Sequence, residues 1–262
     1  SVSSLATSGG PSLHQILMKE IVNQKEKTNV HLDLFGRPPE AVVRQEMGES
    51  RWEAEKDSPF IPTFLAFLAE TILHHSEDPQ HLFRSPCDAG NMELLIDQFS
   101  IGRVDIVNLQ TRSIHLAAGV FKKFFTDLPQ AIVPRSVFDQ LMRLEDISHE
   151  ELLEAARTIL LYQVPKHNYC LLHFLLSFLR DLEVKRGINR KNIAITFAPH
   201  VLVRQAENIG NMNAQDMQRF VLETQTAPEI LDGWIEHVAD LFDDSSSPKP
   251  VNPIQFRKRA VN

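Results

Sequence analysis

The densest apolar run in the sequence, between Tyr169 and Leu179, constrains the fold of this chain more than any other segment. It is interrupted by His173, and it is well short of the roughly 20 residues that a helix needs to span a bilayer. A helix that is apolar on most of its sides is stable in a soluble protein only when other elements surround it. We therefore expect a helix that begins at Asn168 and lies at the centre of a helical core.

Other segments carry apolar residues at the spacing of amphipathic helices. Ser148 and Glu151 form a capping-box pattern, Asn189 is a candidate N-cap, and Pro199 is expected to limit the helix that Asn189 begins. Glycine is scarce, and no stretch alternates as a strand does. The sequence therefore predicts an all-α fold of about eight or nine helices. The expected segments are 13–22, 58–73, 91–101, 114–125, 148–161, 168–179, 191–197, a helix opened by Asn213 or Asp216, and 229–242.

Two segments near the N-terminus are expected to lack regular structure. Glycine and two prolines break the helical pattern in Phe35-Gly36-Arg37-Pro38-Pro39, and residues 44–57 are charged with little apolar content. We predict one main domain over residues 31–243. Residues 1–30 are predicted to be an extension with a candidate short helix. Residues 244–262, rich in proline, serine and basic side chains, are predicted to be a linker or a segment that packs on the domain.

Composition excludes several classes of function. The formal net charge of −7 argues against a general nucleic-acid binder, which needs cations to displace the counterions of phosphates. The two cysteines, Cys87 and Cys170, form neither a disulfide framework nor a metal-spaced pair, so a reducing, cytoplasmic compartment is expected. His74 and His75 are adjacent and point to different sides of a helix, so no metal site is predicted there.

Four groups of short patterns occur along the chain in a characteristic order. They are Leu34-Phe35-Gly36; Ile61-Pro62-x-Phe64-Leu65 with Leu82-Phe83-Arg84; His115-x-x-Ala118-x-x-x-Lys122 with Leu128-Pro129; and Val164-Pro165-x-x-Asn168 with Asn192-Ile193-Ala194 and Phe197-Ala198-Pro199. Each pattern is common by itself. Their joint order and spacing over about residues 34–240 resembles the Rho GTPase-activating (RhoGAP) family. The resemblance implies a single helical domain that binds Rho-family small GTPases in the GTP state.

The resemblance places Arg84 at the position of the family's arginine finger, which enters the active site of the partner GTPase. A guanidinium there stabilises the negative charge of the transition state and accelerates hydrolysis by about 10³–10⁵-fold. The neighbouring residues fit this role, because Leu82-Phe83 can anchor the loop in the core and Ser85-Pro86 prevents a helix from continuing through the arginine. By itself, an arginine after an apolar pair is usually a solvated surface residue. Only its place in the family pattern distinguishes Arg84.

Four further residues are candidates for GTPase binding or for support of the finger loop. Lys122 and Asn192 match the family's lysine and asparagine that contact the GTPase or support the loop. Ser85 directly follows the finger position, and Thr126 occupies the position of a family residue that supports the loop. The resemblance also implies that GTP and Mg²⁺ are carried by the partner, so the domain is not itself an enzyme and needs no cofactor of its own. Any membrane association is expected to be indirect.

The sequence departs from the family at three places near Arg84. Thr126 stands where the family usually has an arginine that braces the finger loop. Pro86-Cys87 replaces the usual Ser-Gly after the finger, and His81 replaces a glycine before the aromatic residue. Weaker bracing is expected to reduce the rate, because misplacing a reacting group by about 1 Å can cost about a hundredfold.

These departures leave two alternatives open. The first is a catalytically weak or inactive domain that binds GTPases as an adaptor. The second is a helical scaffold that docks on membranes or partners through the basic cluster Arg257-Lys258-Arg259, although so short a cluster is more often a solvated tail.

Overall fold

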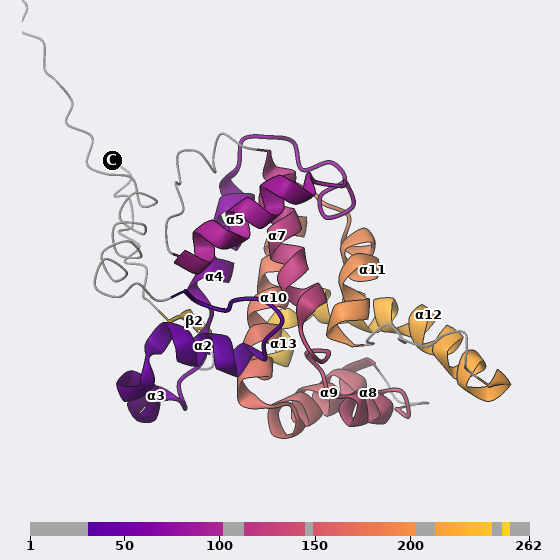
Figure 1. Cartoon of the computed structure of the whole chain (residues 1–262). Helices are drawn as coiled ribbons and strands as arrows, with labels where there is room; N and C mark the ends of the chain where they lie inside the picture. The colour runs from indigo at the N-terminus through magenta and orange to yellow at the C-terminus, as the bar shows by residue number, and fades with distance from the viewer. Residues whose placement is uncertain (1–30, 102–112, 145–148, 203–212, 243–247, 252–262) are drawn as a thin grey trace, which may run out of the picture.

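The computed structural model describes residues 31–101, 113–144, 149–202, 213–242 and 248–251. Over these residues the chain forms eleven helices and two very short strands, which confirms the all-α prediction with more helices than expected (Figure 1). The elements are α2 (Pro39–Met47), α3 (Glu49–Glu55), β1 (Phe60–Ile61), α4 (Thr63–His74), α5 (Ala89–Ile101), α7 (Ile114–Asp127), α8 (Arg135–Leu141), α9 (His149–Gln163), α10 (Lys166–Arg186), α11 (Arg190–Val201), α12 (Ala214–Glu236), α13 (Val238–Leu241) and β2 (Lys249–Pro250).

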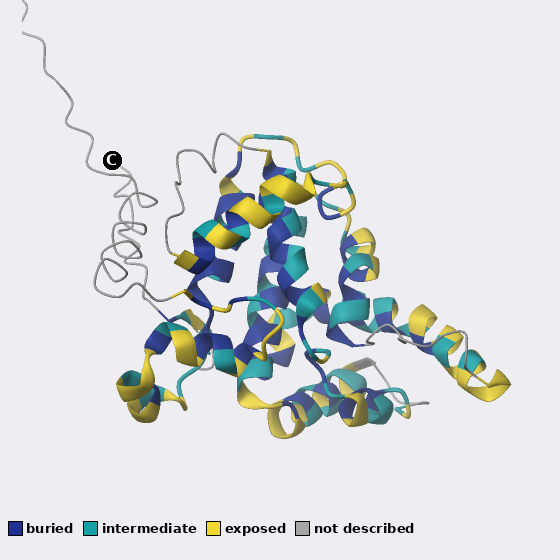
Figure 2. Ribbon diagram, in the orientation of Figure 1, coloured by how far each residue is buried: buried dark blue, intermediate teal, exposed yellow. Residues whose placement is uncertain are grey.

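Helix α10 is the central element, as its apolar sequence predicts. It contacts α2, α4, α11, α12 and α13, and its buried residues lie on several sides of the helix. The buried positions of α4, α7 and α10 form a continuous interior in Figure 2, while α5 and one end of α12 carry much of the exposed surface. The helix ends at Gly187, whose left-handed backbone (φ 67°) suits a residue without a Cβ.

Local sequence signals correctly predict the beginnings of two helices. The Asn189 side chain accepts a hydrogen bond from the Asn192 amide and caps α11, and the Asn213 side chain accepts one from the Asp216 amide and caps α12. Both caps satisfy backbone donors that the first turn of a helix leaves without partners. The predicted capping residue Ser148 and the predicted helix at 13–22 lie outside the described residues.

Several predicted boundaries were wrong. Asn168 does not open α10, which begins at Lys166, and its amide instead donates to the Ile132 carbonyl at 2.8 Å. Pro199 does not end α11, which continues to Val201, and Pro228 lies inside a continuous α12 where two separate helices were expected. The helix expected from residue 58 begins only at Thr63, after β1. Helix α8 was not predicted.

The charged segment 44–57 is also helical, contrary to prediction. Helix α2 begins at Pro39, a residue suited to the first turn, and α3 follows after Gly48. Three of their apolar residues, Val43, Met47 and Trp52, gather into a second small core with Val251, while Val42 is buried in the main core. Val251 follows β2, which pairs in parallel with β1, so residues 248–251 of the predicted tail pack on the domain.

Candidate functional site

Arg84 lies in the connection between α4 and α5, on a segment that we call the Arg84 loop (residues 79–87). The side chains of Leu82 and Phe83 are buried, whereas Arg84 is exposed. Two tight turns shape the backbone, since the Arg84 and Ser85 amides both donate to the His81 carbonyl, at 2.9 and 3.0 Å. Among the described residues the Arg84 guanidinium has no ion pair or hydrogen bond, so its donors face solvent.

Phe83 anchors the loop immediately before Arg84. Its ring meets Phe197 edge-on at 5.0 Å between centroids, and it also contacts the rings of Phe121 and Phe178. The backbone of Phe83 is left-handed (φ 65°), a conformation that costs free energy for any residue with a Cβ. Aromatic packing against α7, α10 and α11 stabilises Phe83 in this conformation. The buried ring therefore fixes the direction in which Arg84 projects from the surface.

Lys122 of α7 contacts the backbone of Phe83. Its ammonium donates to the Phe83 carbonyl at 2.8 Å, and the side chain is half-buried. The carbonyl has no other hydrogen bond among the described residues, so Lys122 satisfies an acceptor that a left-handed turn exposes. Lys122 therefore contacts the loop directly, one residue before Arg84.

The structure does not bring the other predicted residues into hydrogen-bonding contact with Arg84. Asn192 is exposed in the first turn of α11, and among the described residues its side-chain amide has no hydrogen bond. The Thr126 hydroxyl donates to the Lys122 carbonyl of its own helix at 3.1 Å. It therefore does not brace the loop. Ser85 contributes through its backbone amide alone.

Sequence reasoning missed His200, which lies at the end of α11 close to Lys122. Burial, and then the positive charge of Lys122, lower the pKa of this histidine. It is therefore neutral near pH 7, so Lys122 has an uncharged imidazole as its neighbour. No sequence pattern identified His200, because its proximity to Lys122 arises only when α7 and α11 pack together.

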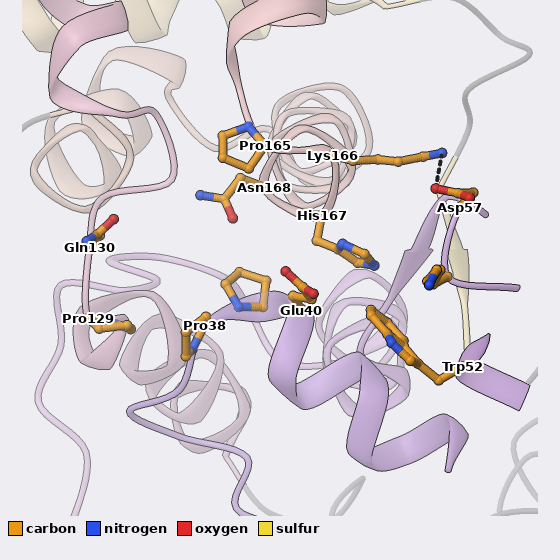
Figure 3. A pocket seen from close by; sticks show the side chains of 12 residues that line it. Pro38, Glu40, Trp52, Asp57, Pro129, Gln130, Pro165, Lys166, His167 and Asn168 are labelled. Carbon is orange, nitrogen blue, oxygen red and sulfur yellow. Dashed lines mark ion pairs between the residues drawn. The ribbon is translucent and has the colours of Figure 1, made fainter. Parts of the chain in front are cut away.

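A separate hollow of about 560 Å³ lies between the first turns of α2 and α10 (Figure 3). Its walls include the stacked rings of Trp52 and His167, with centroids 5.2 Å apart, and an ion pair of Lys166 with Asp57 at 3.9 Å. Neither Arg84 nor Lys122 lines it. No group of side chains in the described part of the chain could hold a metal ion, and no described helix has the length and apolarity to cross a membrane.

Comparison with known protein families identifies the family of this chain. The model of the RhoGAP domain matches residues 62–206, just over half of the chain, a span that includes Arg84, Lys122 and Asn192. The chain belongs to the RhoGAP family.

Relatives and solved structures agree with this assignment. Mouse Rho GTPase-activating protein 25 is 25% identical over 192 residues, and mouse Rho GTPase-activating protein 1 is 24% identical over 185 residues. The matches cover 70% and 68% of this chain but only 29% and 41% of the two relatives. The chain therefore spans less than half the length of these relatives.

Two solved structures share the fold. Human Rho GTPase activating protein 15 superposes with a TM-score of 0.64 at 18% identity, covering 90% of this chain and all of that one. The BH domain from GRAF, a GTPase regulator associated with focal adhesion kinase, gives 0.52 at 14% identity, covering 71% of this chain and 98% of that one. At these identities the likeness concerns the fold alone.

Proposed function

We propose that this RhoGAP domain binds a Rho-family GTPase in its GTP state and accelerates GTP hydrolysis by inserting Arg84 into the partner's active site. The single observation that carries the proposal is the geometry of the Arg84 loop. Arg84 is exposed and has no ion partner among the described residues. It follows Phe83, whose ring is buried among aromatic side chains and whose carbonyl accepts a hydrogen bond from Lys122. On this proposal GTP and Mg²⁺ belong to the partner, and the chain acts in the cytoplasm without a cofactor of its own.

The chemistry requires that Arg84 be free before binding and fixed after it. Charge develops on the transferring phosphoryl group and on the leaving oxygen, and a guanidinium placed there stabilises the transition state more than the ground state. An arginine already held by a carboxylate would first have to lose that partner. Arg84 has none among the described residues, and the anchors at Phe83 limit the entropy that its loop loses on binding.

Asn192 and Lys122 are proposed to complete the contact surface. Asn192 offers an unoccupied amide at the start of α11, a helix that also contributes Phe197 to the anchor of the Arg84 loop. The ammonium of Lys122 has three donor hydrogens, and its one described hydrogen bond, to the Phe83 carbonyl, leaves capacity for a second acceptor on the partner.

The test is single-turnover GTP hydrolysis by a panel of Rho, Rac and Cdc42-type GTPases. Arg84→Ala is expected to remove most of the acceleration, by about 10³-fold or more for a full finger, while affinity for the GTP-bound partner changes little. Arg84→Lys keeps the charge without the planar fork and should recover only a small part. Arg143→Ala, at another exposed arginine, is the matched control. A wild-type domain that accelerates no member of the panel would exclude the proposal.

One observation favours a second candidate, a GTPase-binding adaptor. Thr126 bonds to its own helix and leaves the Arg84 loop without the arginine brace that the family usually has at this position. An adaptor would bind GTPases in a GTP-dependent way, accelerate hydrolysis little, and keep its affinity in Arg84→Ala. Strong turnover by the wild-type domain would exclude it.

A further inference from the structure

Cys87, at the end of the Arg84 loop, fits against helix α7 at a position that only glycine leaves open. A Cβ added to Gly119 would lie 2.4 Å from the Cys87 sulfur, far inside van der Waals contact. The sulfur also lies 3.9 Å from that of Met92 on α5, so the half-buried thiol lies between two helices. Glycine inside a helix is unfavourable relative to alanine, and this close approach is the reason that the structure offers for it.

The gap that Gly119 leaves for the Cys87 sulfur, which we call the notch, lies on the same face of α7 as Lys122, whose ammonium contacts Phe83. Gly119 and Lys122 are three residues apart, a spacing that makes side-chain positions neighbours on a helix surface. Helix α7 therefore contacts the Arg84 loop twice, at Phe83 before the arginine and at Cys87 after it. Only Arg84, Ser85 and Pro86 lie between the two contacts, and proline fixes one of the few remaining backbone angles.

The exit of the loop is fixed as well. Asp88 follows Cys87, and its side chain accepts a hydrogen bond from the Asn91 amide at 2.7 Å, at the start of α5. The Asp88 carbonyl accepts from the Met92 amide at 3.0 Å. The chain after Cys87 is thus committed to α5, and the thiol cannot leave the notch by a shift of the downstream backbone without breaking this first turn.

We propose that Cys87, seated against Gly119, is a positioning residue that holds the Arg84 loop in the orientation needed for catalysis. The seat replaces bracing that Thr126 does not provide. The proposal rests on the proposed function of Arg84. It predicts an energetic coupling between positions 87 and 119 that appears in the rate of GTP hydrolysis on the bound partner rather than in affinity.

The test uses Gly119→Ala, Cys87→Ala and the double variant. The alanine methyl at 119 should displace the thiol and lower the maximal single-turnover rate by about ten- to a hundredfold, with affinity for the GTP-bound GTPase within about threefold. Cys87→Ala alone should lower the rate by only about threefold, because the loop keeps its other contacts. The double variant should recover to the level of Cys87→Ala, since the shortened side chain makes room for the methyl. Gly233→Ala is the matched control, because a Cβ at that helical glycine meets nothing within 4 Å.

A second measurement does not depend on any GTPase. Alkylation of Cys87 should be at least about tenfold faster in Gly119→Ala than in the wild type, because the displaced thiol becomes accessible. Cys170 serves as the internal control, since it is buried and burial raises the pKa of its thiol to about 11. Hydrogen exchange at the Arg84 and Ser85 amides should also accelerate in Cys87→Ala, which keeps the test decisive if Gly119→Ala does not fold.

The outcomes separate the seat from the finger. If the wild type is active while Gly119→Ala keeps its rate and its alkylation kinetics, the seat is excluded and the proposed function stands. A double variant no better than Gly119→Ala would also exclude it, as would wild-type exchange of the loop amides in Cys87→Ala. If the wild type accelerates no GTPase, the proposed function fails and the positioning role fails with it, whatever the alkylation rates show.

Discussion

At the scale of single residues, the Arg84 loop stores its strain at His81 and Phe83. Both have left-handed backbones, with φ of 58° and 65°, although both carry a Cβ. The strain at Phe83 is balanced by buried aromatic contacts and by the hydrogen bond from Lys122. His81 is exposed, and among the described residues it forms hydrogen bonds only through its backbone carbonyl, which accepts from the Arg84 and Ser85 amides. Its left-handed conformation therefore has no compensating side-chain contact.

His81→Gly is therefore expected to stabilise the domain by about 0.5–1 kcal/mol. Relief of the left-handed conformation, worth roughly 1–2 kcal/mol, outweighs the extra entropy that glycine gives the unfolded chain. Urea denaturation of both proteins measures the difference. Gln80→Gly, at the exposed neighbour without a left-handed backbone, is the control and should be mildly destabilising. Equal losses in the two variants would show that the strain at His81 is negligible.

A candidate site can be predicted from the sequence only where a pattern singles out a position. The family resemblance singles out Arg84, Lys122 and Asn192, whose roles stay predictions, and the missing glycine at 81 indicates a departure in the loop. The seat of Cys87 on Gly119 gave no such signal, because a contact between residues 32 positions apart leaves no periodicity in the sequence. His200 was missed for the same reason. These contacts depend on how helices pack, which single-sequence patterns do not encode.

At the scale of helices, Arg190 fixes the start of α11, two residues before Asn192. Its guanidinium reaches Asp232 at 3.0 Å and Glu236 at 2.9 Å on α12, and Glu183 at 3.5 Å on α10. Hydrogen bonding to Asp232 raises the pKa of Arg190, which marks a strongly favoured charged form. One side chain thus ties the N-terminus of α11 to two other helices.

Arg190→Met is expected to destabilise the domain by about 2–3 kcal/mol, because the partly buried Asp232 and Glu183 and the half-exposed Glu236 lose their common counter-ion. The urea midpoint should fall at an unchanged slope. Arg37→Met is the control, since its pair with Asp33 is more than half exposed and should contribute at most about 1 kcal/mol. A loss no larger than that of the control would mean that solvent already screens the Arg190 network.

Helices were predictable from the sequence where apolar periodicity was dense, and they were misjudged where tertiary packing overrides local signals. Pro228 lies within α12 because packing against α11 compensates for one missing backbone hydrogen bond. Helices α2 and α3 were missed because their few buried residues pack against distant segments. Val42 joins the main core beside α10, and Val43, Met47 and Trp52 pack with Val251.

At the scale of the whole molecule, two half-buried histidines link folding to pH. Burial lowers the pKa of His167 in the hollow beside Trp52, and burial together with Lys122 lowers the pKa of His200. In the unfolded chain both side chains titrate near pH 6.5. The unfolded state therefore binds more protons than the folded state once the pH falls below about 6.5.

Stability should consequently decrease as the pH falls from about 6.5 towards the lowered folded pKa values, and should be nearly independent of these two groups above pH 7. Urea denaturation at pH 7.5 and pH 5.5 measures the drop. His167→Gln with His200→Gln should make the drop smaller, because glutamine does not titrate. An undiminished drop in the double variant would assign the acid sensitivity to carboxylates instead.

Because His200 lies beside Lys122, its protonation would also put a second positive charge next to the lysine that holds Phe83. Loss of hydrogen-exchange protection at the Arg84 amide should therefore accompany the loss of global stability in the wild type and be weaker in His200→Gln.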